Sequence, residues 1–295
     1  MQTLLGRNTV VLFGVGHTNA HILKMWKMRP PKNAQLICVS DFPVVTYSGM
    51  LPGVIAGQYP KSAMEIDLVR LTQSAGARLI IDEVVGLEAS KRQLLFTDRP
   101  PFVFDALSIG IGSRPSFTGV SIEDSSPLIP VKPMQTFLFR LRDKLNEIIA
   151  ENVKPRIVIV GGGVGSLEIA FCLWERFFGT PKYSVDRWPN NVLPKITLLT
   201  GGDQVGAGLN EKSVEQVRQE LDRRGIEVRT HSRVVNIDTD GLTLKDNAKV
   251  EADVVLWATN AVGAPILYKL GLPTDEKGFL LTDSTLQVQG FEGIF

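Results

Sequence analysis

Two short glycine-rich stretches have the residue types and spacing that bind the pyrophosphate of a dinucleotide. They read GVGHTN at 14–19 and GGGVGS at 161–166. In such a turn the first glycine permits a tight bend and the second lets backbone N–H groups approach the phosphates, while the third position needs a small residue where helix meets strand. Asparagine at the third position of the first turn predicts a looser helix–strand fit there. The candidate phosphate-binding residues are Gly14, Gly16, His17, Asn19, Gly161, Gly163, Val164, Gly165 and Ser166.

Each glycine turn lies between an apolar run and a helical pattern. Strands are predicted at 9–13 and 156–160, with helices that open near His17 and Val164, and each helix is followed by a second strand, at 35–39 and 196–200. Strand–helix–strand order requires a parallel sheet with helices on its faces. The predicted fold class is therefore α/β, with two Rossmann-like dinucleotide-binding domains.

The acid that holds the nucleotide ribose is expected about 20 residues after such a turn. The second strand of the first unit ends at Ser40 and Asp41. Either Asp41 binds the ribose from one position later than usual, or Ser40 forms a weaker hydrogen bond to it. In the second unit this place holds Thr200 and Gly201, without a carboxylate or an arginine. The choice between NADH and NADPH therefore stays open.

The stretch VVTYSGMLPGVIAGQY at 44–59 is apolar but poor in helix- and strand-forming residues. Its glycines permit unusual dihedrals or a close approach of the backbone, and its proline removes a donor and fixes a bend. One interpretation is a buried loop packed under a helix, and the other is a cradle for a flat apolar ligand. The candidate ligand-contacting residues are Tyr47, Ser48, Gly49, Met50 and Pro52, with Leu51 beside them.

Other chemistry has little support in the sequence. His17 and His21 share a helical face, but no third ligand accompanies them, so no metal site is predicted. Cys38 and Cys172 form no CxxC pair and are expected to pack in apolar surroundings.

With 32 basic and 31 acidic residues the formal charge is +1, which gives no electrostatic basis for nucleic-acid binding. No apolar run approaches the roughly 20 residues of a membrane span, and a cytoplasmic location is expected.

Several further segments, taken with the glycine turns, resemble one flavoprotein superfamily. They are GHTNAHILKMWKMRP (16–30), YSGMLPGVIAGQY (47–59), FDALSIGIGSRP (104–115), PVKP (130–133) and DVVLWATNA (253–261). Together they resemble the pyridine nucleotide–disulfide oxidoreductase superfamily, in the branch of type II NADH dehydrogenases and of the oxidoreductase domain fused to selenide, water dikinase.

This resemblance implies a glutathione reductase-like chain in which an NAD(P) domain is inserted into an FAD domain. The implied FAD domain comprises 1–120 and 263–295, and the implied NAD(P) domain comprises 121–262. FAD would bind the first glycine turn, with 47–53 against the flavin, and NAD(P)H would bind the second. Further cofactor contacts implied by matching segments are Gly112, Arg114, Thr200 and Asn260, and the implied catalytic residues are Glu168 near the nicotinamide and Lys132 near the flavin.

The implied activity is hydride transfer from NAD(P)H to FAD and onward to a quinone or another small acceptor. Without a cysteine pair, the disulfide-reductase mechanism is not expected. The rival interpretation is a catalytically silent flavin- and nucleotide-binding module that serves a partner such as a selenide, water dikinase domain. A homodimer and a peripheral membrane contact through a missing C-terminal segment also remain open.

The end of the sequence carries two expectations. The final FEGIF is expected to complete the sheet of the FAD domain. In the family a Gly-Asp pair that holds the FAD ribityl follows such a strand, and this sequence stops at Phe295, where that pair would begin. The FAD domain is therefore expected to be incomplete, with weak binding of FAD.

Overall fold

The computed structural model describes residues 8–132, 134–151, 153–183, 193–259 and 261–295. The chain forms two compact units. The first unit comprises Met1–Tyr47, Glu65–Arg114 and Ala261–Phe295, and the second comprises Ser48–Met64 and Pro115–Asn260. The segment 48–64 thus belongs to the second unit, although the sequence places it in the implied FAD domain. Which cofactor each unit binds stays a prediction.

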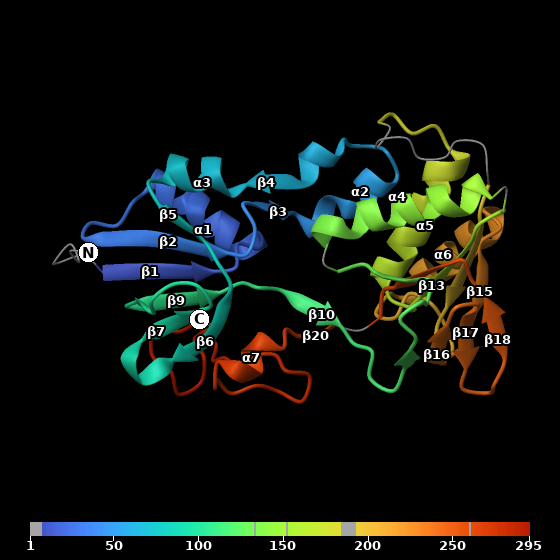
Figure 1. The fold of residues 1–295 in the computed structure, drawn as a ribbon. Coiled ribbons are helices and arrows are strands. Elements are labelled where there is room, and N and C mark those ends of the chain that lie inside the picture. The colour runs from blue at the N-terminus through green and yellow to red at the C-terminus, as the bar shows by residue number, and fades with distance from the viewer. Residues whose placement is uncertain (1–7, 133, 152, 184–192, 260) are drawn as a thin grey trace. The chain divides into compact units, whose positions relative to one another are not determined.

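The first unit is built on a parallel sheet with the strand order β5-β2-β1-β9 (Figure 1). These strands are β1 (Asn8–Phe13), β2 (Ala34–Ser40), β5 (Arg78–Ile81) and β9 (Ala106–Ile109). Ile294 forms a parallel bridge with Leu107, and the N–H of Phe295 donates to the Leu107 carbonyl at 2.8 Å. The last residues therefore extend this sheet beyond β9, which confirms the prediction for FEGIF.

Each face of this sheet is covered by a different layer. Helices α1 (His17–Met28) and α3 (Leu68–Ala75) cover one face, where Leu23 and Leu68 are fully buried. The other face packs against an antiparallel meander and the short helix α7 (Ile266–Lys269). The meander consists of β6 (Val84–Glu88), β7 (Gln93–Phe96) and β8 (Phe102–Val103).

The second unit repeats this architecture with the same order of strands. Its parallel sheet runs β15-β14-β13-β19-β12, made of β12 (Leu128–Pro130), β13 (Arg156–Val160), β14 (Lys195–Leu199), β15 (Glu227–Arg229) and β19 (Val254–Trp257). Helices α4 (Met134–Ala150) and α5 (Val164–Phe178) share one core with the sheet. The other face packs against the strands β16 (Val234–Asp238), β17 (Gly241–Leu244) and β18 (Lys249–Glu251). The predicted α/β fold with two Rossmann-like units is confirmed.

The remaining elements are short or lie at the edges of the units. Helix α6 (Glu211–Arg223) begins at Asn210, whose side chain accepts a hydrogen bond from the Ser213 N–H at 2.9 Å. The strands outside the two main sheets include β3 (Val44–Thr46), β4 (Glu65–Asp67), β10 (Ser113–Pro115), β11 (Ser121–Ile122) and β20 (Ala261–Gly263).

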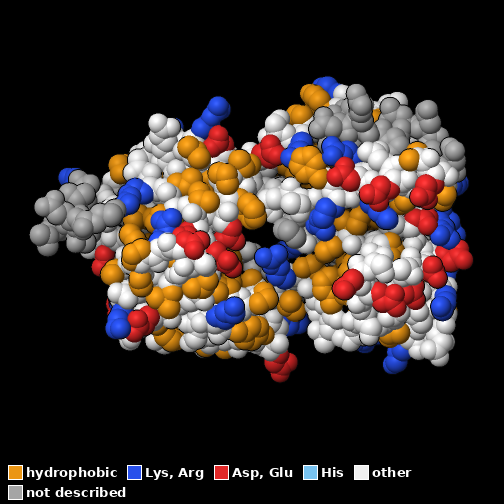
Figure 2. Space-filling model, in the orientation of Figure 1, with side chains coloured by type: hydrophobic (Ala, Val, Ile, Leu, Met, Phe, Trp, Pro, Cys, Tyr) orange, Lys and Arg blue, Asp and Glu red, His pale blue; other side chains and the backbone are white. Residues whose placement is uncertain are grey.

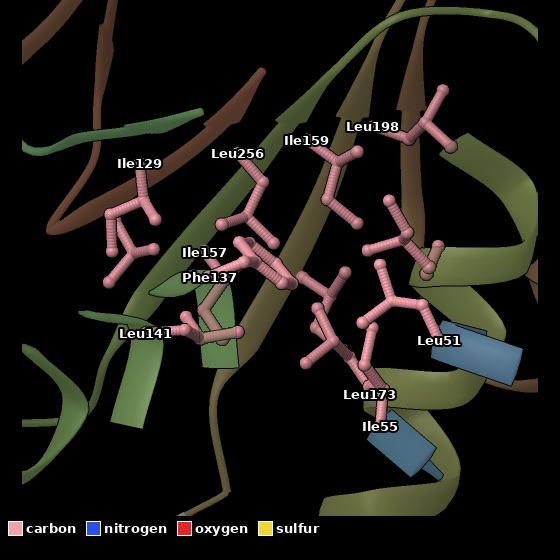
Figure 3. Packing of buried hydrophobic residues seen from close by; sticks show 14 of the residues in the cluster. Leu51, Ile55, Ile129, Phe137, Leu141, Ile157, Ile159, Leu173, Leu198 and Leu256 are labelled. Carbon is pink, nitrogen blue, oxygen red and sulfur yellow. The ribbon is translucent and has the colours of Figure 1, made fainter. Parts of the chain in front are cut away.

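The segment 48–64 forms helical turns whose apolar side chains enter the core of the second unit. Helix α2 (Leu51–Ile55) buries Leu51, Val54 and Ile55, and Figure 3 shows Leu51 and Ile55 beside Leu173 of α5. For these three side chains the packed interpretation of the sequence is the correct one, and Leu51 does not line an open cradle. Met50 is half-buried against the same core, whereas Ser48 and Gly49 are exposed.

An acid-sensitive ion cluster joins β14 and β15 at the edge of the second sheet. Glu227 accepts from Lys195 at 2.7 Å and from Arg229 at 2.5 Å, and these bonds lower the pKa of Glu227 from 4.5 to about 2. The folded state thus gains stability from this carboxylate above pH 4.5 and loses it as the pH falls through about 2. Because the Glu227 side chain is 32% exposed, solvent screening limits the gain to about 1 kcal/mol.

Replacing Glu227 with glutamine should therefore lower the free energy of unfolding by about 1 kcal/mol at neutral pH. The difference between the two proteins should shrink steadily below pH 4.5. Urea unfolding across this pH range measures it. A difference that does not depend on pH would show that the cluster does not act through the charge of Glu227.

Acidic and basic side chains are interspersed over the visible surface of each unit, in keeping with the near-neutral formal charge (Figure 2). Within the described ranges, the helices lack the combination of length and apolar character needed to cross a bilayer.

Candidate functional site

Both glycine turns lie where the strand order of their sheet reverses. Strand β1 pairs with β2 on one side and with β9 on the other, and β13 likewise lies between β14 and β19. In open parallel sheets, ligands bind outside the carboxyl ends of the strands at such a reversal. The turns after β1 and β13 therefore occupy the positions where this fold binds nucleotides.

The turn after β13 is closely packed on its inner side. Gly161 has φ +140°, and a Cβ built on it would lie 2.5 Å from the Ala258 carbonyl oxygen and 2.6 Å from Ser166 Oγ. A Cβ on Gly162 would lie 2.3 Å from Thr200 Oγ1. Glycine at these positions is therefore required by the approach of the strand ends.

The outer side of the same turn is open. A Cβ on Gly163 or Gly165 would meet no atom within 4 Å. Gly163 is the N-cap residue of α5, and no side chain caps the helix there or places an acid in its first turn. The start of α5 thus has open space beside Gly163 and Gly165, and it carries the positive end of the helix dipole. This surface fits a pyrophosphate.

Ser166 contributes to the turn from the inside. Its side chain is buried and its hydroxyl donates to the Ala258 carbonyl at 3.2 Å. Ser166 therefore ties α5 to the end of β19, while Val164 and Gly165 are exposed.

The turn after β1 is also closely packed on its inner side. Gly14 has φ +74°, and a Cβ there would lie 2.9 Å from the Gly110 carbonyl oxygen at the end of β9. A Cβ on Gly16 would lie 3.0 Å from the same oxygen. Helix α1 begins after Gly16 without a side-chain cap or an acid in its first turn. This turn also fits an anionic group at the helix N-terminus.

Asn19 joins α1 to the first turn and to β9 by hydrogen bonds, and the expectation of a looser helix–strand fit stays a prediction. Its side chain is fully buried, and Nδ2 donates to the Gly14 carbonyl at 2.6 Å. Its Oδ1 accepts from Ser108 Oγ of β9 at 2.8 Å. The amide has both a donor and an acceptor, so it replaces the close helix–strand contact of a glycine with a polar bridge.

Replacing Asn19 with alanine should lower the free energy of unfolding by about 1–3 kcal/mol, because Ser108 and Gly14 lose a buried partner. Adding Ser108→Ala should restore part of this loss, since the hydroxyl left without its partner is then removed as well. Urea unfolding of both single variants and the double variant measures the coupling. Strictly additive losses would contradict the bridge.

His17 and Tyr47 lie together at the start of α1. Their ring centroids are 4.9 Å apart, with the planes inclined by 38°. His17 is exposed and Tyr47 is half-buried. The pair places an aromatic surface beside the first glycine turn, within the first unit.

The residues at the ribose positions use their hydroxyl groups in local turns. Ser40 Oγ donates to the Phe42 carbonyl at 2.9 Å, and Thr200 Oγ1 accepts from the Gly202 N–H at 3.2 Å. Asp41 follows Ser40 and is exposed. Partial burial and the nearby Glu83 raise its pKa, and Arg114 acts in the opposite direction. Asp41 and Arg114, both predicted as cofactor contacts, thus lie within electrostatic range of each other.

The remaining predicted residues lie in separate places. Gly112 and Arg114 are exposed near the end of β9, and Gly112 has φ +73°. In the second unit, Glu168 is exposed on α5 and Lys132 is half-buried between β12 and α4. Asn260 lies outside the described residues. The roles predicted for these residues, and for Ser48, Gly49, Met50 and Pro52, stay predictions.

One charged residue near the second ribose position, Arg233, was not predicted from the sequence. A Cβ on Gly201 would lie 3.6 Å from the Cβ of Arg233, so this arginine stands against the end of β14. The only sign of it in the sequence is the basic run RTHSR at 229–233, which begins at the end of a different strand, β15.

The two thiols are unsuited to redox chemistry. Burial raises the pKa of Cys38 to about 12. Burial, followed by the nearby Glu168 and Glu175, raises the pKa of Cys172 to about 11. Both are free thiols that stay protonated at neutral pH, whereas a reactive cysteine is a thiolate. Among the described residues there is also no group of three or more His, Cys, Asp or Glu that could hold a metal ion.

The chain is similar in sequence to NADH dehydrogenase-like and quinone reductase proteins. It is 26% identical over 246 residues to a demethylphylloquinone reductase from Synechocystis, which covers 77% of this chain and 54% of the relative. It is 23% identical over 242 residues to an NADH dehydrogenase-like protein from Mycobacterium tuberculosis, which covers 79% of this chain and 58% of that protein. The chain thus spans about half the length of the curated relatives it matches.

The fold matches solved flavoprotein structures over nearly the whole chain. The structure of NDH2 from Plasmodium falciparum in complex with NADH superposes with a TM-score of 0.81 at 15% identity, covering 98% of this chain and 63% of that one. The model of the pyridine nucleotide-disulphide oxidoreductase family matches residues 10–295. The chain therefore belongs to the pyridine nucleotide-disulphide oxidoreductase family.

Proposed function

We propose that this protein is an FAD-dependent NAD(P)H oxidoreductase of the type II NADH dehydrogenase kind, with a quinone or another small molecule as the electron acceptor. The observation that carries the proposal is the repeated unit, in which a glycine turn at the end of the first strand opens onto an uncapped helix N-terminus. One such unit holds one dinucleotide, and hydride transfer between two cofactors needs two units.

The residues of the second turn would hold the pyrophosphate of NAD(P)H. Gly163 and Gly165 leave room for it, and the first N–H groups of α5 would donate to it. The residues of the first turn would hold the pyrophosphate of FAD in the same way, with Asp41 as the carboxylate for its ribose. When bound, the flavin supplies the hydride and electron chemistry. Glu168 is proposed to lie on the nicotinamide side of the reaction, and Lys132 to stabilise the reduced flavin.

The proposed acceptor comes from the sequence relatives. The relative from Synechocystis carries the name demethylphylloquinone reductase, which makes a quinone the first acceptor to test. Both thiols stay protonated at neutral pH, so electrons would pass to the acceptor without a disulfide step.

The test is steady-state oxidation of NADH and NADPH by the chain with added FAD and a soluble quinone. We expect turnover that requires FAD and the quinone together, and that is lost in Gly16→Val. A branched side chain at Gly16 would collide with the Gly110 carbonyl oxygen and with the phosphates. The Cys38→Ser, Cys172→Ser double variant should retain the activity. Binding of both nucleotides without turnover would instead favour a silent module, such as one that serves a selenide, water dikinase domain.

A further inference from the structure

The end of β14 lacks the group that normally selects NADH. A carboxylate at this place binds the 2′- and 3′-hydroxyls of the ribose and repels a 2′-phosphate. Here Thr200 is buried with its hydroxyl occupied by the Gly202 N–H, and Gly201 has no side chain. Neither residue can discriminate against a phosphorylated ribose.

A second segment of the chain brings an arginine to the same place. The N–H of Ser232 donates to the Thr200 carbonyl at 2.8 Å, and the N–H of His231 donates to the Gly202 carbonyl at 2.8 Å. These two bonds fix 231–233 alongside the end of β14. The stem of Arg233 then lies in ordinary van der Waals contact with the place of a side chain at 201, with Cα, Cβ and Cγ at 3.6–4.0 Å from the position of that Cβ.

The charges around Arg233 leave its guanidinium available. Within the described part of the chain, no carboxylate pairs with it, and the residue is exposed. The acid on the neighbouring strand, Glu227, is already paired with Lys195 and Arg229. The acid that follows Gly202, Asp203, is exposed on the loop that leads to α6. An exposed arginine that pairs with no described carboxylate, at the ribose end of a nucleotide site, is suited to bind phosphate, because its planar donors match the oxygens of that group.

We propose that the second unit accepts the 2′-phosphorylated cofactor, NADPH, at least as well as NADH, and that Arg233 binds the 2′-phosphate. This inference rests on the proposed function, because it assumes that a nucleotide occupies the turn at 161–166. It assigns the specificity of that site to a residue that follows β15, rather than to the end of β14.

The test is titration of the chain with NADPH and with NADH, followed by isothermal calorimetry. We expect NADPH to bind as tightly as NADH or more tightly. Arg233→Gln should weaken NADPH binding about tenfold or more and leave NADH binding unchanged, because only the phosphate loses a charged partner. Lys249→Gln is the matched control: it removes one exposed positive charge from β18 and should change neither affinity.

A second pair of variants separates charge from size. Gly201 has ordinary van der Waals space for a side chain and no positive φ, so Gly201→Asp and Gly201→Asn should both fold. The aspartate would pair with Arg233 and repel the phosphate. It should therefore shift the preference toward NADH by about tenfold or more relative to the asparagine variant.

The outcomes distinguish this inference from the proposed function. If neither nucleotide binds, the proposed function is wrong, and this inference falls with it. If NADH binds about tenfold more tightly than NADPH, or if Arg233→Gln weakens both nucleotides equally, the inference is wrong while the nucleotide site stands.

Discussion

Replacing Gly163 with aspartate should abolish binding of NAD(P)H and leave the second unit folded. A Cβ at this position meets no atom within 4 Å, so the side chain fits without strain. Aspartate is also a favourable N-cap residue, and α5 has no side-chain cap of its own. Near the phosphates, however, the added carboxylate costs about 4 kcal/mol at a separation of about 4 Å, which corresponds to roughly a thousandfold loss of affinity.

Gly163→Asp should lower the affinity for the nucleotide but not the stability of the fold, so loss of binding could not be explained by unfolding. Calorimetric titration with NADH and NADPH measures the affinity, and thermal unfolding measures the stability. The variant should unfold at the same temperature as the parent chain or slightly above it. Retained nucleotide binding in a folded Gly163→Asp protein would show that the pyrophosphate does not lie at the start of α5.

Replacing Arg176 with methionine should strongly destabilise the second unit. Arg176 of α5 is buried, and its guanidinium donates to the carbonyls of Ile55 at 2.7 Å, Tyr183 at 2.9 Å and Val54 at 3.0 Å. It thereby donates to two carbonyls at the C-terminal end of α2, where the helix stops. Methionine preserves the volume but donates nothing. We expect a loss of about 3–5 kcal/mol in the free energy of unfolding, because three carbonyls lose a charged hydrogen-bond donor.

The matched control for Arg176→Met is Arg223→Met on α6. Arg223 is 61% exposed and pairs with Glu220 three residues before it, so its loss should cost less than about 1 kcal/mol. Urea unfolding compares the two variants, and limited proteolysis of 48–64 reports whether α2 has detached. Equal stabilities for the two variants would contradict the role of Arg176 as the anchor of this segment.

The parts of the fold that depend on local pattern could be predicted from the sequence. Apolar strands followed by glycine turns and helices specify βαβ units, and the strand at Arg156–Val160 and the start of α5 at Val164 lie where the pattern predicts them. The hydrogen-bonding demands of parallel strands then leave few alternatives to a repeated Rossmann-like sheet.

The parts that depend on contacts distant in sequence could not be predicted in this way. The apolar residues of α2 fit a packed loop and a ligand cradle equally well, and only their contact with α5 identifies them as core. Asn19 breaks the glycine pattern, and its bond to Ser108 of β9 cannot be inferred from the turn alone. Arg233 reaches the end of β14 through backbone bonds made by its neighbours, which leave no periodic signal in the sequence.

The most direct test of the central claim is an anaerobic absorbance measurement on the chain with saturating FAD. Addition of NADPH or NADH should bleach the visible flavin band, and addition of a quinone should restore it. The bleaching should be absent without the protein. It should also be absent in Gly16→Val and in Gly163→Asp, because each variant removes one of the two dinucleotide sites. A flavin band that stays unchanged after both nucleotides have been added to the folded chain would contradict the assignment as an NAD(P)H oxidoreductase.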